Sequence, residues 1–232
     1  SVAEGGVIVY TATLDHAALT PLAVTLSSGQ TINIAAGSTS GSVSIAAPGE
    51  DPYLDVGSVS RSIAGATGGG FESLTVNGAA VTTTVTDTID TTTVSITGDA
   101  VVAEGATAAY TVSLTSPAQT AVTVNLSYSG IAADGSDLTG VATVTIPAGS
   151  SSANFSVATL QDVLAEGAES FTVTIGSAAG GNFENLVISG TNAAATTSIT
   201  DDDTPALSVS SPTVGEGGFA VFTVSLSNAS TT

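Results

Sequence analysis

The 232-residue chain contains no cysteine, and its basic side chains are reduced to one arginine and one histidine. Without cysteine there is no disulfide framework, no thiolate zinc site and no thiol nucleophile. The single arginine, Arg61, cannot form the positive face that a nucleic acid or an anionic membrane surface requires. His16 is the only side chain that ordinarily titrates near neutral pH, so we expect no enzymatic activity.

Long apolar runs are also missing. No run approaches the ~20 residues that a membrane-spanning helix needs, so we expect no direct membrane insertion. The formal net charge of −19 raises the alternative of a disordered chain. Against it, 42% of the residues are hydrophobic and only 9% are charged. The composition therefore favours a folded, strongly acidic protein.

A Val-x-Glu-Gly motif occurs three times and divides the chain into repeats. Val-Ala-Glu-Gly begins at residues 2 and 102, and Val-Gly-Glu-Gly begins at residue 214. We expect an N-terminally incomplete repeat at 1–90, a complete repeat at 91–203 and the truncated start of a third at 204–232. The longer second repeat carries an extra segment near 131–141. This pattern predicts an excerpt from a longer array.

Within each repeat the hydrophobic pattern has a period of two. In residues 110–114, 122–126 and 171–175, large apolar side chains alternate with threonine, serine or asparagine. Such alternation is typical of strands with one buried face, and no long segment has a period of 3.6. We therefore predict an all-β protein of tandem immunoglobulin-like antiparallel sandwiches, each with seven strands.

Most acidic residues lie in four kinds of segment: the Glu-Gly turn, a loop before a late strand, the extra segment, and the end of each repeat. In a sandwich these segments can meet at one pole. Two carboxylates ~5 Å apart repel by about 3 kcal/mol at an effective dielectric near 20, and calcium accepts 6–8 oxygen ligands. The predicted metal ligands are Glu104, Asp137, Asp162, Glu166, Glu169, Asp201, Asp202 and Asp203 in the second repeat, and Glu4, Asp51, Asp55, Asp87 and Asp90 in the first. The alternative is that these are solvated charges that keep an extended protein soluble.

The order of these motifs resembles the Calx-beta domain and the extender repeats of large RTX-type bacterial adhesins. The second repeat has Glu104-Gly105, then Gly-x-Asp at 135–137, then Asp-x3-Glu-x2-Glu-x-Phe at 162–171, then three aspartates at 201–203. The resemblance implies a Calx-beta-like fold in which these residues bind Ca²⁺. The first repeat lacks the Gly-x-Asp loop, and Asp87-x-x-Asp90 replaces the triplet.

The function implied by this resemblance is that of calcium-rigidified extender repeats of a secreted, extracellular cell-surface adhesin. Such repeats project a distal binding module, and their partners are the neighbouring repeats of the same chain. Two alternatives stay open. One is a glycan- or ice-binding surface, although Tyr53 and Tyr128 are the only plausible stacking residues. The other is a self-assembling fibre or surface-layer subunit that accepts a strand from a neighbour.

Overall fold

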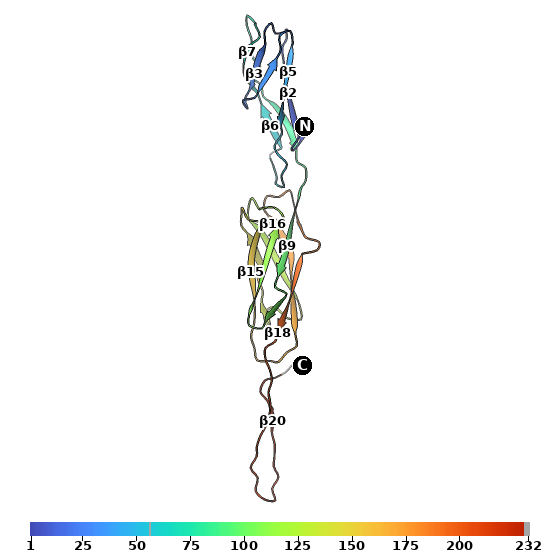
Figure 1. Ribbon diagram of the computed structural model, residues 1–232, viewed down its shortest axis with the longest axis vertical. Coiled ribbons are helices and arrows are strands. Elements are labelled where there is room, and N and C mark those ends of the chain that lie inside the picture. The colour runs from blue at the N-terminus through green and yellow to red at the C-terminus, as the bar shows by residue number, and fades with distance from the viewer. Residues whose placement is uncertain (56, 230–232) are drawn as a thin grey trace. The chain divides into compact units, whose positions relative to one another are not determined.

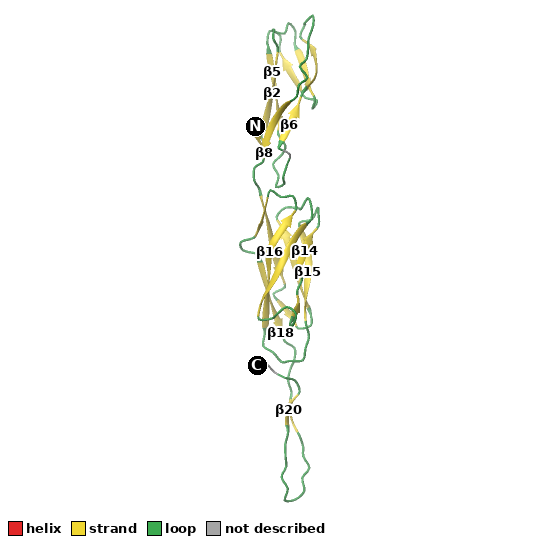
Figure 2. Cartoon of the chain, turned by 180° about the vertical axis from the view of Figure 1, so that it is seen from behind, coloured by secondary structure: helices red, strands yellow, loops and turns green. Residues whose placement is uncertain are grey.

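The computed structural model describes residues 1–55 and 57–229. In this part of the chain all regular structure is β-strand (Figure 2), which confirms the predicted all-β class. The chain forms two compact units, Ser1–Asp90 and Thr91–Thr232. No described segment is a helix of the length and apolarity needed to cross a membrane.

The second unit contains two five-stranded sheets (Figure 1). One has the order β10-β18-β16-β12-β14 and the other β13-β15-β11-β9-β17. Their inward side chains are the apolar positions of the alternating pattern, with Tyr110, Phe171 and Val112 fully buried between the sheets. The strands are β9 (Thr91–Gly98), β10 (Val101–Ala103), β11 (Thr107–Leu114), β12 (Val122–Gly130), β13 (Leu138–Thr139), β14 (Thr143–Ile146), β15 (Ser152–Thr159), β16 (Glu169–Gly180), β17 (Asn185–Ile188) and β18 (Ala194–Thr200).

The number and direction of these strands differ in part from the sequence prediction of seven antiparallel strands. The two sheets together have ten described strands, and the pairs β10–β18 and β17–β9 are parallel. The first strand of the repeat is interrupted after Gly98, and the chain continues as β10 in the other sheet. Gly98 lies against the ring of Tyr110, where a Cβ atom would come within 2.1 Å of Cδ1. The sequence pattern did not indicate this change of sheet, because both halves of the interrupted strand have the same alternation.

The first unit repeats this arrangement with fewer pairings. Its sheets have the orders β1-β8-β6, β4-β3-β7 and β2-β5. The parallel pair β1–β8 corresponds to β10–β18, and Tyr10, Leu22 and Ile34 lie in the core. The strands are β1 (Val2–Ala3), β2 (Val7–Thr13), β3 (Leu22–Leu26), β4 (Thr31–Ile34), β5 (Ser40–Ala46), β6 (Ser58–Arg61), β7 (Ile63–Gly68) and β8 (Val81–Thr86).

Residues 204–229 follow the second sandwich and carry one short antiparallel ladder. It joins β19 (Leu207–Val209) to β20 (Val224–Leu226), with Leu207 opposite Leu226. The same register joins Val94 of β9 to Leu114 of β11 in the complete repeat. The apolar side chains of this ladder are exposed, because the described part of this segment has no second sheet to cover them.

Candidate metal centre

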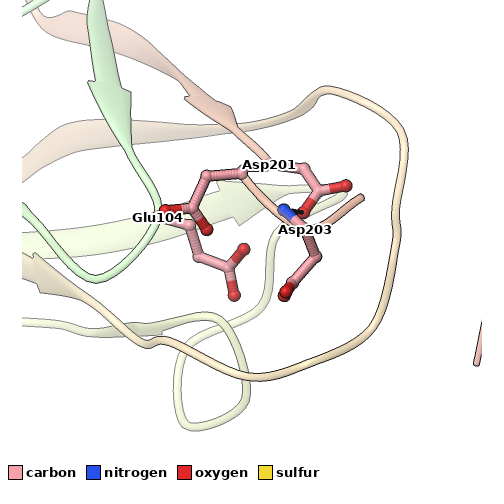
Figure 3. A group of neighbouring side chains, drawn as sticks. Glu104, Asp201 and Asp203 are labelled. Carbon is pink, nitrogen blue, oxygen red and sulfur yellow. Dashed lines mark hydrogen bonds between the residues drawn. The ribbon is translucent and has the colours of Figure 1, made fainter. Parts of the chain in front are cut away.

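The parallel pair β10–β18 brings two of the predicted acidic segments together. Its register places Ala103 opposite Thr200, and the Glu104 amide donates to the Thr200 carbonyl at 3.0 Å. Because parallel strands end at the same edge of a sheet, Glu104 and the aspartates that follow β18 leave that edge side by side. Carboxylate oxygens of Glu104, Asp201, Asp202 and Asp203 all lie within 4.8 Å of one another. Figure 3 shows Glu104, Asp201 and Asp203 converging on one point.

Three further strand ends add acidic residues to the same place. Asp162 follows β15, Glu169 is the first residue of β16, and Asp137 directly precedes β13. These residues surround a cavity of about 20 Å³, which exceeds the ~10–15 Å³ that one water-sized particle needs. The acidic residues that line the cavity are Glu104, Asp137, Asp162, Glu166, Glu169 and Asp201. We call this group, together with Asp202 and Asp203, the second-unit acidic site.

Backbone amides hold the central carboxylates in position. Asp201 accepts from the Glu166 amide at 2.7 Å through Oδ2 and from the Asp203 amide at 3.0 Å through Oδ1. Glu104 Oε1 accepts from the Asp162 amide at 2.9 Å, and Asp162 Oδ1 accepts from the Leu164 amide at 2.7 Å. The Glu166–Asp201 and Asp162–Glu104 bonds connect separate segments and the other two close local turns, so backbone amides orient these carboxylates.

The electrostatics of the site would suit a bound cation. Burial, followed by repulsion from neighbouring carboxylates, raises the pKa of Glu166, Glu169 and Asp203. Burial also raises the pKa of Glu104, although the Asp162 amide works against it. The pKa of Asp201 is lowered by its two backbone amide donors. Asp203 Oδ2 is buried, and no donor in the described chain reaches it. A cation bound among these oxygens would relieve both the repulsion and the unpaired acceptor.

The glycine of the Glu-Gly motif has a structural role in the turn. Gly105 has φ +70°, a left-handed conformation that side-chain-bearing residues seldom adopt. Gly5 and Gly217 have φ values of +66° and +75°. A Cβ atom on Gly105 would also lie 2.6 Å from Oε1 of Gln161. The motif therefore pairs a turn-forming glycine with an acidic side chain that the turn directs to the strand edge.

The first unit has a smaller acidic group around Glu4. The Glu4 side chain is 5% exposed, and no donor group of the described residues reaches either carboxylate oxygen. Sharing a proton with Asp55 and with Asp87 raises the pKa of Glu4 to about 8, and burial adds to the shift. We call Glu4, Asp55 and Asp87 the first-unit acidic site.

Comparison with known families gives one match, which occurs twice along the chain. The family model of the LapA domain matches residues 1–88 and again residues 90–202. The chain belongs to the LapA domain family. Residues 1–88 and 90–202 are therefore adhesin-type repeats, as the sequence resemblance predicted, and an adhesin acts at the cell surface or outside the cell.

Solved structures also match about half of the chain, at low similarity. CBD12 from CALX1.2 is 20% identical with a TM-score of 0.41, and the alignment covers 48% of this chain and 44% of that one. The apo-form Calx CBD1 domain is 20% identical with a TM-score of 0.39, and the alignment covers 47% of this chain and 99% of that one. The calcium binding domain CBD12 of CALX1.1 is 23% identical with a TM-score of 0.40, and the alignment covers 47% of this chain and 44% of that one. No curated protein matches the chain.

Not every predicted ligand of the LapA repeats joins an acidic site. Asp51 accepts from the Tyr53 amide at 2.9 Å within its own loop, and neither Asp51 nor Asp90 belongs to the acidic group around Glu4 in the described chain. Asp202 is close to Glu104, but its Oδ1 also accepts from Gln161 Nε2 at 3.0 Å. Metal binding by all of these residues stays a prediction.

Two amide side chains that contact the second-unit acidic site were not predicted from the sequence. Gln161 bonds Asp202, and Asn228 Nδ2 lies 3.4 Å from Asp203 Oδ1. Because both amides are uncharged and Asn228 lies 25 residues from its partner, no charge pattern could have marked them. The adjacency of Gln161 to the predicted ligand Asp162 was the only available signal.

The stability of the first LapA repeat in chelator should fall as the pH rises from about 4.5 to about 8. Over this range folded Glu4, with its pKa raised to about 8 from 4.5, holds a proton that the unfolded chain releases. Rising pH therefore favours unfolding. The free energy of unfolding stops falling once Glu4 is ionised in the folded state as well. Hydrogen-exchange mass spectrometry of peptides from residues 1–90 measures this stability separately from the second unit.

The variant Glu4→Gln isolates this contribution, because an amide does not titrate. Its stability should decline less between pH 4.5 and 8 than that of the unmodified chain. Glu72→Gln removes an equal charge from an exposed position and should leave the decline unchanged. Equal pH profiles for the unmodified chain and Glu4→Gln would contradict the prediction.

Proposed function

We propose that these LapA repeats are calcium-stabilised spacer units of a large cell-surface adhesin. Their role is to hold a distal binding module away from the cell. The observation that carries the proposal is the second-unit acidic site, where six acidic side chains from four segments of the chain line one small cavity. The whole chain has a single Lys or Arg residue, and that residue, Arg61, lies in the other unit.

Calcium is the cation that suits this site best. All the charged ligands are carboxylates, and the chain has no cysteine for a softer metal. Calcium takes 6–8 oxygens in flexible geometry, whereas magnesium requires a stricter octahedron and keeps several of its waters. The cluster of at least six carboxylates therefore favours calcium over magnesium.

The position of the site connects calcium binding to the spacer role. Asp201 and Asp203 belong to the segment that leaves the sandwich after β18. A cation shared by this segment, Glu104 and Asp162 would hold the exit of one repeat against the body of that repeat. At ~3.3 Å per residue, the twelve residues of β16 are about 40 Å long, so each stiffened repeat would add a length of this order.

Small-angle X-ray scattering in calcium and in chelator tests the spacer role. We expect the maximum dimension of the 232-residue chain to be larger in calcium, because carboxylate repulsion without the ion loosens the segment after β18. Magnesium at the same concentration should have a much smaller effect. Identical scattering curves in calcium and in chelator would refute the spacer proposal, even if calcium binds.

A further inference from the structure

The second unit carries a segment at residues 131–141, called here the arm, that the connection between its strands does not require. In both units the hairpin before this point has the same register, because β12 pairs with β14 as β3 pairs with β4. The bond that closes the first-unit hairpin runs from the Leu26 amide to the Gln30 carbonyl at 2.8 Å. The second-unit hairpin is closed in the same way, from Leu126 to Ala142 at 2.9 Å. Since a short turn joins the same strands in the first unit, the arm serves something other than this connection.

The arm is fastened to the two strands whose ends carry acidic residues of the second-unit acidic site. At its start, the Ile131 amide donates to the Ser170 carbonyl at 3.0 Å, directly after Glu169 on β16. Near its end, Leu138 is fully buried and pairs with Thr159 of β15. Both attachments lie within a few residues of carboxylates that line the cavity, so the arm belongs to the surroundings of the site.

Asp137 is the arm residue that these attachments direct to the cavity. Its carbonyl accepts from the Leu160 amide at 2.9 Å, and its half-buried side chain lines the cavity. Asp137 Oδ2 accepts from the Ala133 amide at 2.6 Å and from the Ser136 hydroxyl at 3.1 Å. The arm therefore presents one carboxylate to the cavity in a fixed orientation.

Tyr128 of β12 holds the far end of the arm. Its hydroxyl accepts from the Val141 amide at 2.8 Å and donates to the Val141 carbonyl at 3.1 Å. Its ring lies against Gly140, where a Cβ atom would come within 2.8 Å of Cε2, and the Gly140 amide donates to Asp134 Oδ1 at 2.7 Å. The register of the hairpins places Ser28 at the corresponding position of the first unit. The tyrosine thus occurs in the repeat that has the arm.

We propose that the arm sets the calcium affinity of the second-unit acidic site and that Tyr128 is its positioning residue. This inference rests on the proposed calcium binding. A ligand group that is already held in its bound orientation loses less freedom when the ion binds, and affinity rises accordingly. Tyr128 does not line the cavity, and both hydrogen bonds of its side chain go to the arm. Its effect on the ion therefore passes through Asp137.

Hydrogen exchange of the full chain over a series of free calcium concentrations tests the proposal. The calcium midpoint of protection in peptides covering residues 160–170 reports the second-unit acidic site. Tyr128→Phe keeps the ring and removes the hydroxyl, and we expect it to raise this midpoint about tenfold, as is usual for groups that orient a metal ligand. In chelator it should speed exchange in the arm. Tyr10→Phe removes a hydroxyl from the core of the first unit and should leave both readouts unchanged.

A double-mutant cycle separates positioning of Asp137 from a general loss of stability. Asp137→Asn removes the charge that the arm presents, and in its background Tyr128→Phe should change the midpoint by less than about twofold. Gly140→Ala displaces the arm in a second way, because the added Cβ meets the Tyr128 ring. It should also raise the midpoint in the chain that keeps Asp137.

The outcomes distinguish this inference from the proposed function. If calcium protects residues 160–170 but Tyr128→Phe and Gly140→Ala leave the midpoint unchanged, the role of the arm is refuted and calcium binding stands. The same holds if Tyr128→Phe raises the midpoint equally with and without Asp137, or if Tyr10→Phe raises it as much. If calcium leaves residues 160–170 of the unmodified chain unprotected, the proposed function fails and the inference fails with it.

Discussion

Calcium should raise the melting temperature of the second unit by on the order of 10 °C, and Glu104→Gln should remove most of this rise. A ligand present at 100 times its dissociation constant stabilises the folded state by about 2.7 kcal/mol. For a domain of roughly 100 residues, each kcal/mol shifts the melting temperature by about 4–8 °C. Calorimetry of the full chain in calcium and in chelator measures the effect.

Glu104→Gln is suited to this test because it removes a charge but keeps an acceptor. Glu104 Oε1 accepts from the Asp162 amide at 2.9 Å, and the glutamine carbonyl can accept the same bond. In calcium we expect affinity to fall at least tenfold. In chelator the same variant should be as stable as the unmodified chain or more stable, because burial of the charged group raises the pKa of Glu104 and its ionised form is disfavoured in the fold.

The opposite signs in the two conditions separate metal binding from general destabilisation. Asp15→Asn is the matched control, since it removes the same charge from an exposed position in the other unit. It should leave the melting temperature of the second unit unchanged both in calcium and in chelator. A melting temperature that calcium leaves unchanged, or a variant that melts lower in both conditions by the same amount, would contradict calcium binding at Glu104.

Phe171→Ala should lower the free energy of unfolding of the second unit by about 3–5 kcal/mol. Phe171 is fully buried between the sheets, and its ring centroid lies 6.4 Å from that of Tyr110. It pairs with Gly130 of β12, where a Cβ atom would lie 2.8 Å from the Phe171 Cα. Removing the ring would therefore leave a cavity in the core.

Urea unfolding followed by hydrogen exchange in residues 91–203 measures this loss. The free energy of unfolding of a domain is only about 5–15 kcal/mol. In the variant, a measurable fraction of the second unit should therefore be unfolded at low urea concentration. Glu169 lies two residues before Phe171 on β16 and lines the acidic cavity, so calcium affinity should fall as well. Phe219 is 97% exposed, so Phe219→Ala should change the free energy of unfolding by no more than about 0.5 kcal/mol relative to the unmodified chain. A loss below 1 kcal/mol for Phe171→Ala would contradict this view of the core.

The sequence pattern predicted part of the candidate site correctly, namely which acidic segments of the second repeat lie close together. The acidic segments of the second repeat were predicted to meet because each one follows or precedes a strand, and the structure brings Glu104, Asp137, Asp162 and Glu169 to one cavity. In the first repeat the same reasoning named Asp51, yet the Asp51 carboxylate accepts from the nearby Tyr53 amide. Asp162 accepts in the same way from the amide two residues on, yet it lines the second-unit cavity, so neither spacing nor the local turn decides which carboxylate reaches the site.

The sequence by itself determined the all-β class, the repeats and the identity of the acidic segments, because alternation and motif order are encoded by residues close together along the chain. Only the tertiary structure decided the change of sheet after Gly98, the parallel register of Ala103 with Thr200, and which carboxylates share a cavity. These features depend on pairing between strands about 100 residues apart. Such pairing is fixed by packing of the whole sandwich and leaves no mark in the local pattern.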